Sequence, residues 1–459
     1  MCFFVSIGHW NCAMQSEWLG PFVRTIPLEV NMNWSHDNEG IFMGIASALY
    51  FVGALLASFT LPFYKNVSPI KILSWCCGLM IIFTGIMCIP NTAVLFLCRF
   101  LNGYVCGCIR SIGSALLYTL TPPDLRTHTS SIYTLVFTFG IFSSFFFGIF
   151  DDAGKIVWRL CISWTSCLSL IFLALKFTVF SDVDSISYMI KFGKEKEARA
   201  LMEKYMADQE VLEFTVENVK KMIAIEEADT KRTGGGFLAE IKTYKKEFWM
   251  ALFMGQATAY CGFQGFLMFN LVFINKDEDN KSDLSLCRIL GCLFIVNEIL
   301  FRTFINMWNI NKYRKTNYLV GHTILAINWF AMCYSYSTNP DVYTYPKVGG
   351  FILAAVVGGA AIATFYVIIT DICSQSLCAV GQGGFLGGMI IVTFCFPFII
   401  EGHTDLDVKT KNLQWLTMGM GIVTSLFTIT GYFYMIETEG LEKEDIYFIL
   451  RGKKTREQC

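Results

Sequence analysis

The chain has 459 residues, of which 54% are hydrophobic and only 16% are charged, and its net charge is −1. A soluble domain carries about a quarter charged residues, so this composition indicates a protein surrounded by lipid. It gives no sign of a nucleic-acid partner. The 18 cysteines are scattered through apolar stretches without the spacing of a zinc site. We interpret them as small packing residues and expect no metal centre.

Twelve stretches of the sequence are apolar and long enough to cross a bilayer, which requires about 20 residues in a helix. In chain order they are 2–26, 40–63, 72–89, 92–120, 129–150, 157–180, 247–275, 284–309, 317–337, 347–373, 377–400 and 413–436. The first is the least regular, because it contains Glu17, Arg24 and two prolines. The sequence therefore predicts an all-α membrane protein with twelve transmembrane helices.

One long polar segment divides these stretches into six and six. We expect an N-terminal six-helix half at 1–180, an amphipathic helical linker at 181–246, a C-terminal six-helix half at 247–437 and a polar tail at 438–459. Lysine and arginine concentrate in the loops on the side of the linker. The positive-inside rule then predicts that both termini and the linker face the cytoplasm or the mitochondrial matrix. The host membrane, plasma or mitochondrial inner membrane, stays open.

Short motifs of charged, polar and small residues follow one another along the chain. Small residues let helices approach closely in lipid. The motifs are Arg99-Phe-Leu-Asn-Gly103 with Gly107 and Pro122-Pro-Asp-Leu-Arg126, the run 185–201, Gln256 with Gly262-Phe-Gln264, Arg314-Lys315 with Gly321, and Glu437-Thr-Glu-Gly440. Their order and spacing resemble those of sugar porters of the major facilitator superfamily. The run Cys12-Ala-Met-Gln15 is similar to a motif of the organic-ion, synaptic-vesicle-like branch.

This resemblance implies a major facilitator fold, in which two homologous halves surround a central site. An internal repeat agrees with it, since Thr119, Pro122, Leu125 and Arg126 align at a constant shift with Asp371, Ser374, Leu377 and Cys378.

The resemblance also implies ion pairs at the inner face that hold one access state. The acid expected between the second and third stretches is missing, since no Asp or Glu occurs between Glu39 and Asp124. We therefore expect the retained arginines to pair with acids of the linker and tail. This predicted inner latch comprises Arg99, Arg126, Asp184, Arg314, Glu437 and Glu439.

Four polar residues are candidates for binding a solute. Gln256, Gln264 and Asn270 lie on the seventh stretch, and helical spacing keeps the two glutamines near one face. The resemblance implies that glutamines here hydrogen-bond sugars. Arg110 lies within the fourth stretch, where it could face a central cavity or instead contact lipid headgroups or a partner subunit.

Further charged residues lie at membrane depth, where they are costly and point to function by default. Glu17 and Arg24 share one helix face and could form a structural salt bridge. Glu298 and Arg302 are four residues apart and can pair with each other. Asp371 stands where the family has an acid at the inner end of the tenth helix, and we interpret it as part of a latch.

Two functions are compatible with this sequence. The first is a secondary carrier for a small polar or organic solute, such as a sugar or an organic ion, working by alternating access. The second is a transport-inactive accessory subunit of a large membrane complex, such as a mitochondrial respiratory assembly, which the missing acids favour. No arrangement of catalytic residues or nucleotide-binding loop appears, so we expect neither an enzyme nor a cofactor. The expected partners are membrane lipid, a small solute or a larger complex.

Overall fold

The computed structural model describes most of the chain. The described residues are 2–22, 39–121, 126–151, 156–205, 241–261, 313–338, 375–401 and 406–441 with a few single gaps, and scattered positions in 212–227, 289–303, 350–372 and 446–450. Within them the structure is helical. The helices are α1 (Cys2–Glu17), η1 (Gly20–Phe22), α3 (Glu39–Thr60), η3 (Leu61–Tyr64), α4 (Pro69–Met87), α5 (Thr92–Leu120), α6 (Arg126–Ile149), α7 (Val157–Thr178), α8 (Ile186–Lys191), α9 (Glu195–Tyr205), α12 (Lys245–Tyr260), α16 (Arg314–Thr338), α18 (Gln375–Glu401) and α19 (Leu406–Tyr434).

Ten of the twelve predicted stretches contain one of these helices. The other two, 284–309 and 347–373, lie largely outside the described residues. Among the described residues, α3, α4, α5, α6, α7 and α19 are long and apolar enough to cross a membrane. The first helix is shorter than predicted and ends at Glu17, because Gly20 and Pro21 favour the short 3₁₀ turn of η1 over a continuing α-helix.

Local signals place the start of two helices. The side chain of Ser68 caps α4 by accepting a hydrogen bond from the amide of Lys71, and Pro69 occupies the first helical position. Asn91 caps α5 in the same way. Since the turn 88–91 is short, α4 and α5 run in opposite directions.

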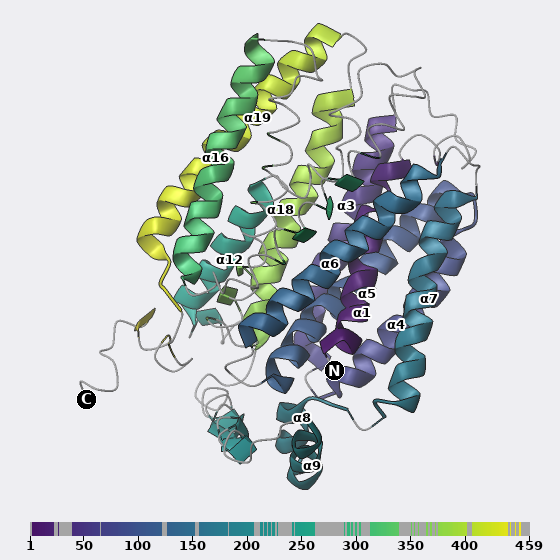
Figure 1. Cartoon of the computed structure of the whole chain (residues 1–459), viewed down its shortest axis with the longest axis vertical. Coiled ribbons are helices and arrows are strands. Elements are labelled where there is room, and N and C mark those ends of the chain that lie inside the picture. The colour runs from purple at the N-terminus through teal and green to yellow at the C-terminus, as the bar shows by residue number, and fades with distance from the viewer. Residues whose placement is uncertain are drawn as a thin grey trace.

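The helices form two groups that lie side by side (Figure 1). The group α1 to α7 makes the N-terminal half, and α12, α16, α18 and α19 belong to the C-terminal half. The short helices α8 and α9 lie at one end of the bundle, here called the linker end, and α1 begins at that same end. The opposite end is called the far end. The halves meet chiefly where α18 packs against α3.

Glycines allow the closest helix contacts. A Cβ atom on Gly103 of α5 would lie 2.0 Å from the carbonyl oxygen of Tyr50 on α3, and one on Gly255 of α12 would lie 2.4 Å from that of Gly381 on α18. Such close backbone approach drives helix association in lipid.

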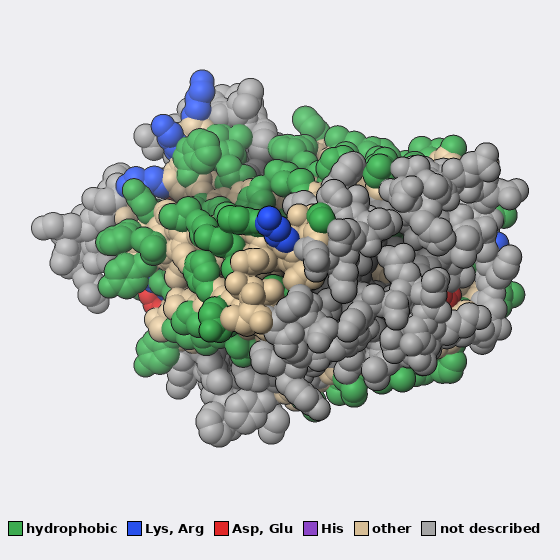
Figure 2. Space-filling model, turned by 90° about the horizontal axis from the view of Figure 1, so that it is seen from above, with side chains coloured by type: hydrophobic (Ala, Val, Ile, Leu, Met, Phe, Trp, Pro, Cys, Tyr) green, Lys and Arg blue, Asp and Glu red, His purple; other side chains and the backbone are tan. Residues whose placement is uncertain are grey.

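The outer surface is strongly hydrophobic. Large apolar side chains such as Phe63, Trp75 and Phe177 are exposed on it, and apolar side chains cover much of the described surface in Figure 2. This is the pattern of an integral membrane protein.

Candidate functional site between the two halves

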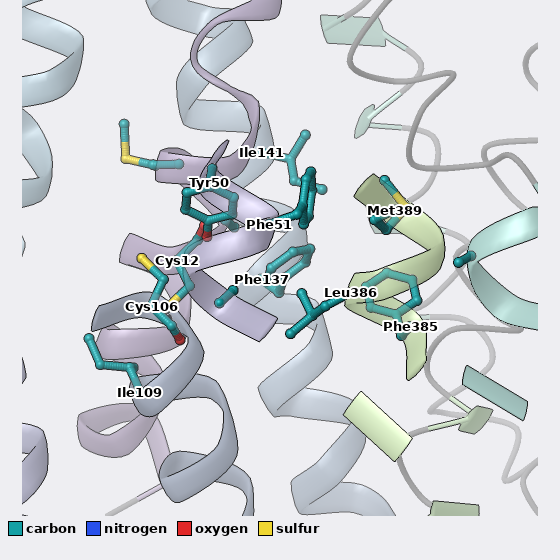
Figure 3. Close-up of a cluster of buried hydrophobic side chains, with 14 of the residues drawn as sticks. Cys12, Tyr50, Phe51, Cys106, Ile109, Phe137, Ile141, Phe385, Leu386 and Met389 are labelled. Carbon is teal, nitrogen blue, oxygen red and sulfur yellow. Dashed lines mark hydrogen bonds between the residues drawn. The ribbon is translucent and has the colours of Figure 1, made fainter. Parts of the chain in front are cut away.

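Arg110 lies where the two halves meet. It is only 5% exposed, and its guanidinium carbon lies 5.1 Å from the ring centroid of Phe137 on α6 and 5.5 Å from that of Phe385 on α18. Aromatic faces attract cations at such distances. In Figure 3 the side chains of Phe51 and Phe137 lie on one side and those of Phe385 and Met389 on the other. We call this contact between the halves the seam; it comprises Phe51 of α3, Arg110 of α5, Phe137 of α6, and Phe385 and Met389 of α18.

The seam lies well inside the bundle, nearer the linker end than the far end. Arg110 precedes the linker-end terminus of α5, Leu120, by ten residues, and Phe385 follows the linker-end terminus of α18, Gln375, by ten. At 1.5 Å per residue each lies about 15 Å from the linker end, which is inside the part of the bundle that crosses a hydrocarbon core of about 30 Å. In carriers built from two such halves, the solute site lies between the halves, near the bilayer midplane.

Gln256 reaches the same turn of α18 from within the C-terminal half. Its side-chain nitrogen donates a hydrogen bond of 2.5 Å to the carbonyl oxygen of Gly384, the residue before Phe385. Gln256 follows Lys245, the first residue of α12, by eleven positions, so it lies at a similar depth. Two of the four predicted solute-binding residues therefore contact adjacent residues of one helix turn.

A neutral hydrogen-bonded bridge joins the halves one turn nearer the linker end. Ser111 on α5 donates to the side-chain oxygen of Gln382 on α18 at 2.6 Å, and the Gln382 nitrogen donates to Ser114 at 3.4 Å. None of these three residues is among those predicted from the sequence, because the predicted candidates are charged residues or lie on the seventh stretch. The signal was available, since Gln382 is an amide within the glycine-rich run 381–388 of an apolar stretch.

The prediction that Arg99 belongs to an inner latch is wrong. Because α5 begins at the far end, Arg99 lies about 10 Å from that end, away from the linker. Its guanidinium donates to the carbonyl oxygen of Ala46 at 3.2 Å and to that of Gln15, and it lies over the rings of Trp18 and Tyr50. Arg99 thus joins α1, α3 and α5 within one half.

The polar residues of α1 are also used inside the N-terminal half. Asn11 donates to Ser169 and Gln15 donates to Thr165, both at 2.9 Å, which fastens α1 to α7. Cys12 donates through its thiol to the carbonyl oxygen of Cys106. Glu17 is fully buried and accepts from Ser16 at 3.2 Å. These positions serve packing between helices of one half.

Two acids of the predicted latch lie at the linker end and contact helix N-termini. Asp184 accepts a hydrogen bond of 2.6 Å from Ser68, the cap of α4. Glu437 accepts from the backbone amide of Lys315 at 3.1 Å, in the first turn of α16, next to Arg314. A carboxylate is favourable at a helix N-terminus, where the dipole is positive. The two acids follow the last helix of each half and so repeat one arrangement.

The remaining predicted site residues lie outside the described residues, or have side chains that do. They are Gln264, Asn270, Arg24, Arg126, Glu298, Arg302, Asp371 and Glu439. In the described part of the chain, no group of three or more His, Cys, Asp or Glu side chains could hold a metal ion.

Comparisons with known proteins agree with this architecture. The fold is similar to that of the proton:xylose symporter XylE bound to 6-bromo-6-deoxy-D-glucose, with a TM-score of 0.81 at 14% identity over 98% of both chains. It is also similar to the inward-open conformation of the xylose transporter XylE from E. coli, with a TM-score of 0.72 at 13% identity over 98% of both chains. At these identities the likeness establishes the fold, that of the major facilitator superfamily.

Sequence comparisons extend this likeness. The chain is 24% identical over 384 residues to YwtG of Bacillus subtilis (strain 168), whose name describes a metabolite transport protein, and the alignment covers 80% of this chain and 78% of YwtG. Residues 19–449 match the family described as "Sugar (and other) transporter". This match covers most of the sequence, and the chain therefore belongs to that family of membrane transporters.

Proposed function

We propose that this chain is a secondary carrier that moves a small polar or organic solute across the membrane by alternating access. The observation that carries the proposal is the convergence of Arg110 and Gln256 on Gly384 and Phe385 of α18. One residue comes from each half, and a carrier of this kind binds its solute between its two halves.

The contacts between the halves also suit a carrier. The linker-end bridge of Ser111, Ser114 and Gln382 is neutral, and a net hydrogen bond of this kind contributes only about 1 kcal/mol. Such a contact can break and re-form as the halves move, which alternating access requires. The fold and family give no support to the accessory-subunit interpretation, so the carrier is the function we propose.

Uptake into proteoliposomes tests this proposal. Three labelled probes cover the solute classes: D-xylose, because the similar XylE is a xylose symporter, and benzenesulfonate and tetraethylammonium as an organic anion and cation. We expect saturable uptake of one of them. Gln256→Ala should reduce it about tenfold or more, because this variant removes the hydrogen bond that holds the α18 turn of Gly384 and Phe385 in place. The matched control is Gln414→Ala on α19, outside the seam. Absence of saturable uptake for all three probes would contradict the proposal.

The orientation is a separate proposal. We propose that the linker end faces the cytoplasm or matrix, because lysine and arginine concentrate in its loops. In sealed vesicles of known orientation, protease added to the cytoplasmic or matrix side should cleave within 206–240. Cleavage there only from the opposite side would contradict it.

A further inference from the structure

The chemistry of the seam narrows the class of solute. We propose that the solute is a small organic anion with an apolar body, whose charge is held by Arg110 and whose body packs against Phe137 and Phe385. This inference rests on the carrier function proposed above and adds the identity of the solute class.

The first argument is charge. Arginine stays protonated at all physiological pH values, so Arg110 carries a positive charge within the apolar span of α5, where charge is costly and usually functional. Its planar guanidinium matches carboxylate, sulfonate and phosphate oxygens in a two-point contact. A neutral sugar has no group that can make this charge-assisted two-point contact.

The second argument is the composition of the surroundings. The seam is lined on the N-terminal side by Phe51, Phe137 and Ile141 and on the C-terminal side by Phe385, Leu386 and Met389 (Figure 3). A solute with many hydroxyl groups needs several hydrogen-bonding partners, because each buried group left unpaired costs free energy. An aromatic or aliphatic body instead gains from contact with these side chains.

The third argument is that the nearby neutral polar groups are already used. The Gln256 amide nitrogen is bonded to Gly384, and Ser111, Ser114 and Gln382 are bonded to one another. A sugar would have to displace these contacts, whereas an organic anion can use the guanidinium and the rings without doing so. The rings also come from both halves, so one solute can contact both at once.

Four probes separate charge from apolar body without any mutation. Benzenesulfonate has both, benzenesulfonamide is its neutral counterpart, methanesulfonate has the charge without the ring, and D-xylose has neither. Binding to the purified full-length protein in detergent is measured by isothermal titration calorimetry. We expect benzenesulfonate to bind at least about tenfold more tightly than each of the other three. Benzenesulfonamide and D-xylose cannot form the charge-assisted hydrogen bond, and methanesulfonate and D-xylose lack the apolar ring.

Substitutions then test whether Arg110 is the residue that binds the negative charge of the probe. Arg110→Gln should weaken benzenesulfonate binding about tenfold to a hundredfold and leave benzenesulfonamide binding unchanged. Arg110→Lys should give an intermediate affinity. Phe385→Ala should weaken both ring-containing probes. Arg159→Gln is the matched control, since Arg159 lies at the far end over Trp158, and it should change none of the affinities.

Three results would overturn the inference. The first is binding of D-xylose or benzenesulfonamide as tightly as benzenesulfonate, and the second is unchanged benzenesulfonate affinity in Arg110→Gln. The third is no binding of any of the four probes. Saturable xylose uptake without anion preference would overturn this inference alone, whereas absence of all uptake would overturn the carrier function itself.

Discussion

Two arginines on α5 have opposite surroundings. Arg99 and Arg110 are eleven residues apart, which is close to three helical turns, so they lie on the same face. Arg99 hydrogen-bonds carbonyl oxygens of α1 and α3 inside one half. Arg110 lies over one ring from each half. Contacts within a half persist when the halves move, whereas contacts across the seam must change. A buried charge therefore stabilises the fold at one position and is suited to solute recognition at the other.

The largest effect is expected at Arg99. Replacing it with leucine removes the donors to Gln15 and Ala46 inside a fully buried site. The loss of these buried charge-assisted hydrogen bonds and of the contacts with the rings of Trp18 and Tyr50 should lower the free energy of unfolding by about 2–4 kcal/mol. Thermal melting of the detergent-solubilised protein measures it, with Arg159→Leu as control. A wild-type melting temperature for Arg99→Leu would show that Arg99 does not hold the half together.

The bridge across the seam should have a smaller effect, and on motion more than on folding. Gln382→Leu removes the hydrogen bonds to Ser111 and Ser114. The equilibrium should shift by about 1–2 kcal/mol toward a state open at the linker end. Hydrogen–deuterium exchange of 375–390 should then be faster, while exchange in α4 and α7 stays the same. Equal exchange in both proteins would exclude the bridge as a gate.

The two acids at the linker end occupy equivalent positions in the two halves, so the effects of replacing them can be compared. Glu437→Gln weakens the charge–dipole contact with α16, and Asp184→Asn weakens the contact with Ser68 at α4. Each should lower stability by only about 0.3–1 kcal/mol. Melting curves of the single and double variants should show additive losses, because the sites lie in different halves. Strong coupling between them would mean that both acids belong to one latch after all.

The smallest effect is expected in the linker, outside the membrane. Hydrogen bonds from Lys220 and Arg199 lower the pKa of Glu195 below its ordinary value. A carboxyl group of this kind stabilises the folded state above its unfolded pKa, and the contribution is lost as the pH falls through the lowered pKa. Because Glu195 is partly exposed to water, salt screens these pairs. Hydrogen exchange of α9 should rise only slightly at pH 4 or in high salt, and a large rise would contradict this.

Much of the fold could be predicted because apolar stretches of about 20 residues are a strong signal. Arg110 and Gln256 could also be chosen, since polar residues at membrane depth are rare. The partners of these two residues could not be predicted from the sequence, because the contact of Arg110 with Phe385 and that of Gln256 with Gly384 depend on how the helices pack. Arg99 was predicted at the linker end but lies near the far end, for a simpler reason. The fourth helix of an alternating series enters from the far side, and Arg99 stands near its beginning.

Ligand-induced stabilisation tests the contrast between the two arginines most directly. Melting temperatures are measured with and without saturating benzenesulfonate for the wild type, Arg99→Lys and Arg110→Gln, since a ligand that binds only the folded state raises the melting temperature. We predict that Arg99→Lys melts at a lower temperature but keeps the ligand-induced increase, whereas Arg110→Gln keeps a melting temperature near that of the wild type and loses the increase. An increase that survives in Arg110→Gln, or that disappears in Arg99→Lys, would contradict the assignment of the solute site to the seam.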